Sequence, residues 1–84
     1  MNLYNSIMEA LEENNKVILE DEKGTGIRVI VRDRTGRIHS TEIIPNSIIN
    51  DADHPESILA EAVERRHKDV EDVKRKSVET RSNG

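Results

Sequence analysis

The feature that most constrains the fold is the contrast between short aliphatic segments before Pro45 and one long charged segment after Pro55. The short segments alternate apolar and polar residues, which is typical of half-buried β-strands. The segment after Pro55 instead repeats apolar residues at helical spacing for roughly six turns. A helix much longer than the strands it packs on predicts a compact body with a projecting arm.

The N-terminal part of the chain predicts a short helix followed by a strand. These apolar residues recur at helical spacing: Leu3, Tyr4, Ile7, Met8 and Leu11. Asn14 and Asn15 end the helix, because asparagine tolerates left-handed backbone and competes locally for hydrogen bonds. Residues 17–19 are too few for a helix and are interpreted as a strand. The two glycines within residues 21–26 then make a connecting turn.

Residues 27–33 and 37–44 predict the two strands of a hairpin. The turn between them ends at Gly36, which can take a positive φ after a type I turn. Ile30 is the one apolar residue on the polar side of the first of these strands. Pro45 ends the sheet because it cannot donate a ladder hydrogen bond.

Cross-strand pairs predict the register of this hairpin. A register that places Ile27 beside Ile43 also places Arg28 beside Glu42, which gives one apolar pair and one pair of opposite charges. A shift by one residue loses both pairs. We therefore expect this register.

The second half of the chain predicts a loop over residues 46–53 and then the long helix. Asp53 can cap the helix and Pro55 fits its first turn. The helix is expected to run to about Lys76, where residues 77–84 begin a flexible tail. Its second half should project beyond the sheet, because a five-residue strand covers only about 17 Å.

The chain therefore predicts an α+β fold with a short N-terminal helix, a three-stranded antiparallel meander and a long C-terminal helix. Its 84 residues allow a single domain, over residues 1–76. The interior is almost purely aliphatic, with no Phe or Trp. Because such a core is thin, we expect a homodimer.

The apolar stripe of the long helix has two interpretations. It consists of Leu59, Val63, Val70 and Val73, with Arg66 at the missing heptad position. Either its first half packs on the sheet and the rest is solvated, or Val70 and Val73 form a seam with another helix. Residues 38–64 carry six acids and no Lys or Arg, a pattern that attracts a basic partner. The predicted partner-binding residues are Arg66, Val70, Val73, Glu61 and Glu64.

The arginines of the predicted hairpin favour an alternative function, nucleic-acid binding. They are Arg28, Arg32, Arg34 and Arg37. A two-stranded ribbon with arginines on one side can contact phosphates or guanine in a major groove. The net charge of −4, the single aromatic residue and the expected Arg28–Glu42 pair instead favour an internally paired hairpin.

Catalytic and cofactor signatures are not evident in the sequence. There is no cysteine, which excludes disulfides and thiolate metal sites and suits a reducing cytoplasm. His39, His54 and His67 are dispersed through the chain and are expected to face solvent, so neither a metal nor another cofactor is predicted. Ser40 follows His39 on a strand, where adjacent side chains point to opposite faces. Apolar runs of three residues at most exclude a membrane-spanning helix, and we expect a cytoplasmic protein that is not an enzyme.

The order of helix, three-strand meander and helix in a small acidic chain resembles that of small phage-encoded inhibitor proteins, including some anti-CRISPRs. The resemblance is one of layout over most of the chain. It implies a non-enzymatic protein-binding module that blocks a host protein in the host cytoplasm. The basic distal helix departs from the acidic DNA mimics among such proteins.

Overall fold

The computed structural model describes the backbone of residues 2–83 and the side chains of residues 2–77. Its elements are helix α1 (Leu3–Glu12), strands β1 (Lys16–Glu22), β2 (Gly26–Arg32) and β3 (His39–Pro45), the short helix α2 (Asn46–Asp51) and the long helix α3 (Pro55–Asn83). The strands form an antiparallel sheet in the order β1-β2-β3. The predicted α+β fold is therefore confirmed.

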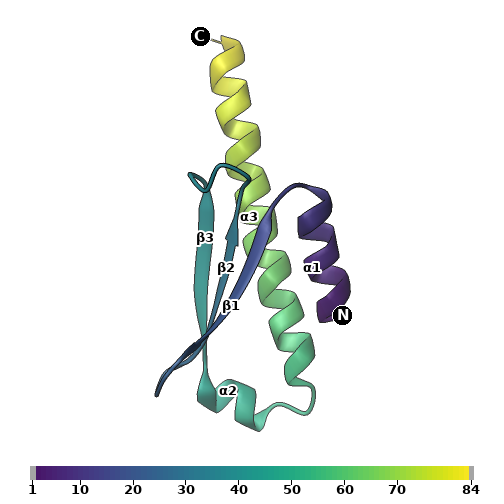
Figure 1. Ribbon diagram of the computed structural model, residues 1–84, viewed down its shortest axis with the longest axis vertical. Coiled ribbons are helices and arrows are strands. Elements are labelled where there is room, and N and C mark those ends of the chain that lie inside the picture. Colours follow the sequence, from purple (N-terminus) through teal and green to yellow (C-terminus); the bar gives the residue numbers. More distant parts are fainter. Residues whose placement is uncertain (1, 84) are drawn as a thin grey trace.

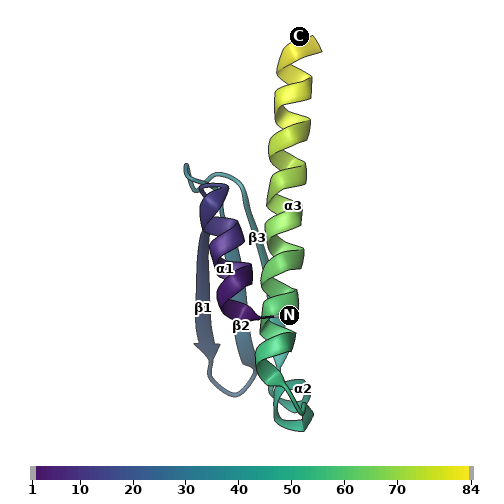
Figure 2. The same cartoon turned by 90° about the vertical axis from the view of Figure 1, so that its right-hand side faces the viewer.

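The molecule has two layers, a sheet and a pair of helices. Figure 1 shows α1 and α3 side by side, and Figure 2 shows both on the same side of the sheet. The last turns of α3 extend beyond the end of the sheet, which gives the molecule an extent of 49 Å along its longest axis. Within the described residues, every helix is too short or too polar to cross a membrane.

Helix α1 begins and ends with asparagines. The Asn2 side chain accepts a hydrogen bond from the Tyr4 amide at 2.8 Å and caps the N-terminus. At the C-terminus Asn14 takes a φ of 63°, and the Asn15 amide donates to the carbonyl of Ala10 at 2.9 Å. This left-handed cap confirms the predicted end of the helix and turns the chain into β1.

The predicted register of β2 against β3 is wrong by one residue. Ile27 lies opposite Ile44, so an apolar pair survives the shift, but Arg28 does not lie opposite Glu42. Arg28 forms an ion pair with Glu22 instead. Glu42 contacts Arg65 and Arg66 of α3. Since Arg28 and Glu42 both form ion pairs outside the β2–β3 hairpin, the observed register does not need the predicted Arg28–Glu42 pair.

Two local features set the observed register. The connection between β2 and β3 is wider than predicted, because the Asp33 amide donates to the carbonyl of Ile38 at 2.9 Å. Within it Gly36 takes the predicted positive φ, 78°. At the other end of the hairpin, a Cβ on Gly26 would lie 1.9 Å from the carbonyl oxygen of Ile44. Only glycine allows the two backbones to approach this closely.

The two faces of the sheet differ in what lies over them. The buried cluster of Val29, Ile44, Ala62 and Val63 joins α3 to one face, which we call the covered face. Alternate strand residues point the other way, to a face that we call the open face. The open face carries Lys16, Ile18, Glu20, Arg28, Ile30, Arg32, His39, Thr41 and Ile43.

The segment between β3 and α3 is more helical than predicted. Asn46–Asp51 form α2, where the sequence predicted a loop, because Pro45 ends β3 in an extended conformation and serves as the N-cap of α2. Helix α3 begins at Pro55, as predicted. It continues past the expected end at Lys76 to Asn83, so the segment assigned to a tail is helical up to that residue, and Gly84 lies outside the described residues.

Candidate functional site

The interface predicted on the distal part of α3 is not one exposed surface. Val73 is 44% exposed, but Val70 is only 1% exposed and belongs to the interior. The prediction that Val70 contacts a partner is therefore corrected: it is a core residue. An apolar seam of two valines is absent from the described part of α3.

The sheet reaches farther along α3 than the sequence predicted. Each strand has seven residues, which is about 23 Å at 3.3 Å per residue. The part of α3 that ends at Val70 spans about 24 Å. Hydrogen bonds hold the helix on both sides of Val70: Ser40 donates to Asp69 at 2.8 Å, and Asn15 donates to Glu71 at 3.0 Å. The projecting part of α3 begins after these residues.

Arg66 attaches α3 to β3. It forms an ion pair with Glu42 at 3.0 Å and donates to the Ser40 hydroxyl at 2.9 Å. Arg65 donates two hydrogen bonds to the same carboxylate, at 3.2 and 3.0 Å. The hydrogen bond to Glu42 raises the pKa of Arg65 above its ordinary value, although burial opposes this. Glu42 thus lies under α3, and Arg66, predicted to contact a partner, is an internal contact.

A buried polar cluster joins the end of α1 to α3. The Asn15 amide nitrogen lies 2.9 Å from Nδ1 of His67 and also donates to Glu71. With this amide orientation His67 Nδ1 accepts, so the proton of the neutral ring lies on Nε2. Lys74 contacts Glu71 at 2.7 Å and donates to the carbonyl of Glu13 at 3.1 Å. The expectation that His67 faces solvent is wrong, because α1 and β1 meet over it.

Glu71 is the charged centre of this cluster. Burial by itself raises the pKa of its carboxyl group, but hydrogen bonds from Lys74 and Asn15 and the charge of Lys74 hold it below the ordinary value. Glu71 is therefore ionised at neutral pH and holds two elements together. We interpret the cluster as a structural joint.

Glu61 and Glu64, also predicted to bind a partner, lie on the outer side of α3. With Arg65 and Lys68 they surround a shallow hollow of about 240 Å³. Lys68 contacts Glu64 at 3.0 Å. Because two acids and two bases balance each other there, the hollow presents little net charge to a partner.

The outer side of α1 is an apolar surface that the sequence analysis did not identify. α1 packs mainly against α3 and buries the small side chains of Ser6 and Ala10. Small residues let two helices approach closely. This orientation turns Tyr4, Met8 and Leu11 outward, with Tyr4 67% and Leu11 49% exposed. The signal in the sequence was the pair of small residues four positions apart, which mark the buried side.

Leu19 extends this surface onto the neighbouring strand. It lies on β1, the strand that α1 contacts, and is also exposed. We call Tyr4, Met8, Leu11 and Leu19 the α1 strip. The strip therefore consists of exposed apolar residues on two elements that contact each other.

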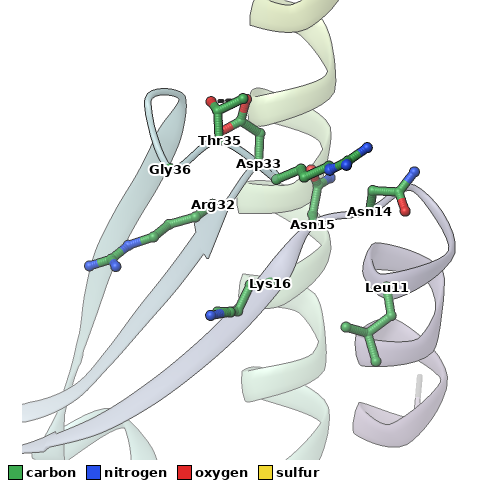
Figure 3. Close-up of a pocket in the computed structure, with 9 residues that line it drawn as sticks. Leu11, Asn14, Asn15, Lys16, Arg32, Asp33, Thr35 and Gly36 are labelled. Atoms are coloured by element: carbon green, nitrogen blue, oxygen red, sulfur yellow. Dashed lines mark hydrogen bonds between the residues drawn. The ribbon is translucent and has the colours of Figure 1, made fainter.

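The structure separates the four predicted nucleic-acid-binding arginines. Arg28 is paired with Glu22, whereas Arg32, Arg34 and Arg37 are exposed. Lys16 is the cross-strand neighbour of Arg32, and Figure 3 shows both side chains extending to the same side, away from α1.

Three of these cations, Lys16, Arg32 and Arg34, line an open depression between the end of α1 and the β2–β3 connection. Its volume is about 600 Å³, and its lining includes Lys16, Arg32, Arg34 and Asn14. The lining combines three cations and two amide groups with one carboxylate, that of Asp33, which leaves a net positive charge. These groups suit an anion better than an apolar ligand.

The described side chains do not assemble a metal site, and Ser40 does not form a triad with His39. No group of three His, Asp and Glu residues among them is placed to hold a metal ion. Ser40 lies on the covered face and donates to Asp69, whereas His39 lies on the open face. The strongest candidates for function are therefore surfaces.

Comparisons with protein-family models, with curated proteins and with solved structures find no match for this chain.

Proposed function

We propose that this protein is a non-enzymatic protein-binding module that docks through the α1 strip. The observation that carries the proposal is the exposure of Tyr4, Met8 and Leu11 at i, i+4 and i+7 on one helix. This spacing produces a continuous apolar stripe. Exposed apolar stripes mark interaction sites, and tyrosine is among the residues that contribute most to binding energy at interfaces.

The charges around the α1 strip indicate the chemistry of its partner. Exposed acidic residues lie on α1, just after it, and on the same side of β1 as Leu19: Glu9, Glu12, Glu13 and Asp21. A complementary partner is a helix whose own apolar stripe is flanked by Lys or Arg. A second copy that docked by its own α1 strip would bring acidic residues against acidic residues, which disfavours this contact. The homodimer expected from the sequence is therefore the alternative to a basic partner at this surface.

The mode of action follows from the size of the module. A small protein that occupies an apolar surface on its target blocks whatever else needs that surface. This agrees with what the layout resemblance implies, an inhibitor of a host protein. Occupancy alone produces the effect, so the proposal needs no catalytic residue.

The test removes the strip without touching the interior. Met8→Asp with Leu11→Asp should lower the capture of partner proteins from a cell lysate by at least about tenfold, because two charges replace apolar contacts in a desolvated interface. Ile48→Asp is the matched control, since Ile48 is equally exposed but lies on α2. Proton–nitrogen spectra check that all three proteins stay folded.

Two outcomes would contradict the proposal. One is the capture of the same proteins by the wild type and the strip variant, and the other is an equal loss with Ile48→Asp. Sedimentation equilibrium at about 100 μM addresses the competing assembly. A mass twice the 9.6 kDa of the chain that returns to 9.6 kDa in the strip variant would reassign the strip to self-association.

A further inference from the structure

Six of the described cations contact carboxylates: Arg28, Arg65, Arg66, Lys68, Lys74 and Arg75. The described side chains provide no ion pair to five others: Lys16, Lys23, Arg32, Arg34 and Arg37. Lys23 lies at the other end of the sheet, whereas Lys16, Arg32, Arg34 and Arg37 gather where β1 begins, β2 ends and the β2–β3 connection runs. Together with His39 we call them the basic end.

Three members of the basic end form a row across the open face. Lys16 lies opposite Arg32, and Arg32 lies opposite His39. Adjacent strands are about 4.8 Å apart, so the row spans about 10 Å. Like charges directly opposite each other destabilise a sheet. In the free protein Lys16 and Arg32 repel each other. An anion bound between them would attract both side chains and replace this repulsion with attraction.

Asp33, the acidic residue next to Arg32, does not form an ion pair with the row of Lys16, Arg32 and His39. The Asp33 carboxylate accepts a hydrogen bond from the Thr35 hydroxyl at 2.9 Å and from the Ile38 amide at 3.2 Å. It therefore closes the connection between β2 and β3. Arg34 follows it in the chain and lines the 600 Å³ depression with Lys16 and Arg32. The basic end keeps a net positive charge in a protein whose formal charge is −4.

We propose that the basic end binds the phosphate backbone of a nucleic-acid duplex without reading its sequence. A line of cations matches the repeated phosphates of a backbone better than a single anion. Proteins that bind single strands stack bases on aromatic side chains, and the single aromatic residue here, Tyr4, lies on α1 on the other side of the sheet. This site is separate from the α1 strip and does not depend on the function proposed for it.

The proposal predicts a salt dependence. If the four permanent cations each neutralise one phosphate, the logarithm of the binding constant falls with the logarithm of salt concentration with a slope of about −3.6. Binding should then weaken about 150-fold between about 50 and 200 mM salt. Different duplex sequences should bind equally.

The experiment measures fluorescence anisotropy of a labelled duplex with the full chain over this salt range. Lys16→Gln with Arg32→Gln should weaken binding more than tenfold at about 50 mM salt and reduce the slope by about 1.8. Lys23→Gln is the control, because Lys23 is an exposed cation at the other end of the sheet. Its binding curve should match that of the wild type.

A second measurement separates binding from folding. Lys16→Glu replaces a pair of like charges opposite Arg32 with a pair of opposite charges, so the thermal midpoint should rise by about 2 to 4 °C while duplex binding is lost. The proposal is overturned if the duplex does not bind at about 50 mM salt, if a single strand of the same length binds more tightly, or if Lys23→Gln weakens binding as much as the double variant.

Discussion

Where β1 begins and β2 ends, the charged residues on the two faces of the sheet differ in whether they form ion pairs. On the covered face Glu42 meets Arg65 and Arg66 of α3. On the open face Lys16 lies opposite Arg32, and the described residues place no acid in contact with either. Both faces belong to the same three strands. At this end of the sheet the charges that α3 covers are therefore paired and the uncovered ones are not, whereas farther along the open face Arg28 is paired with Glu22 of the neighbouring strand.

The apolar residues of α3 show the same dependence. Val70 and Val73 are one turn apart, yet only Val70 is buried, because the sheet and the end of α1 lie against it. The parts of the molecule that are left uncovered are those that can bind something else. Substitutions in covered parts should therefore lower the stability of the fold more than substitutions in uncovered parts.

The largest effect is expected from a charge placed on the covered side of α3. Val70→Asp should lower the free energy of unfolding by about 4 kcal/mol or more, because the carboxylate would be buried without a partner. Val73→Asp should change it by less than about 0.5 kcal/mol, since that side chain is largely exposed. Urea unfolding followed by circular dichroism measures both. Equal destabilisation by the two variants would mean that the covered side extends beyond Val70.

A smaller effect is expected where the register of the sheet is set. Gly26→Ala should cost about 2 to 3 kcal/mol, because its Cβ would collide with the backbone carbonyl of Ile44. Gly24→Ala should cost only about 1 kcal/mol, since that position has a positive φ but open space around it. If Gly26→Ala is tolerated as well as Gly24→Ala, β2 and β3 pair differently, and the assignment of residues to the two faces fails.

The smallest effect concerns the joint between α1 and α3. The pKa of Glu71 in the folded protein lies below its ordinary value, because hydrogen bonds from Lys74 and Asn15 outweigh the effect of burial. Glu71 thus contributes stability that is fully present above its unfolded pKa of about 4.5 and is lost as the pH falls through the folded value. Glu71→Gln should therefore cost about 1 kcal/mol at neutral pH and make stability less sensitive to acid.

Thermal unfolding between neutral and acidic pH measures this difference. Glu9→Gln is the control, because it removes one acid from the exposed side of α1. If Glu71→Gln and Glu9→Gln respond to acid alike, Glu71 is not the titrating group of the joint.

Local patterns in the sequence were enough to predict most of the elements. The alternation of Ile27, Val29 and Val31 predicted a strand with one buried side, and the structure buries Val29 and Val31 completely. Asn14 and Gly36 were expected at positions of left-handed backbone, and both have positive φ. These features depend on a few neighbouring residues, so the sequence carries them directly.

The candidate surfaces could not be predicted in the same way. The sequence grouped Arg28 with the other arginines of the β2–β3 hairpin, although Glu22 of β1, six residues away, neutralises it. It placed Tyr4 and Leu11 on the apolar stripe of a helix, but helical spacing shows that a stripe exists and not which part of it is covered. The small residues Ser6 and Ala10 decided that orientation by packing against α3.

The sequence by itself determined the α+β class, the order of α1, the three strands and α3, and the residues at which α1 ends and α3 begins, because backbone propensities and periodicity act locally. Only the tertiary structure decided the register of β3, the burial of Val70 and His67, and the pairing of Glu42 with α3. Each of these depends on residues far apart in the chain meeting across a layer. Interior packing and long-range ion pairs form only when such segments are in contact, so the sequence of a single segment does not predict them.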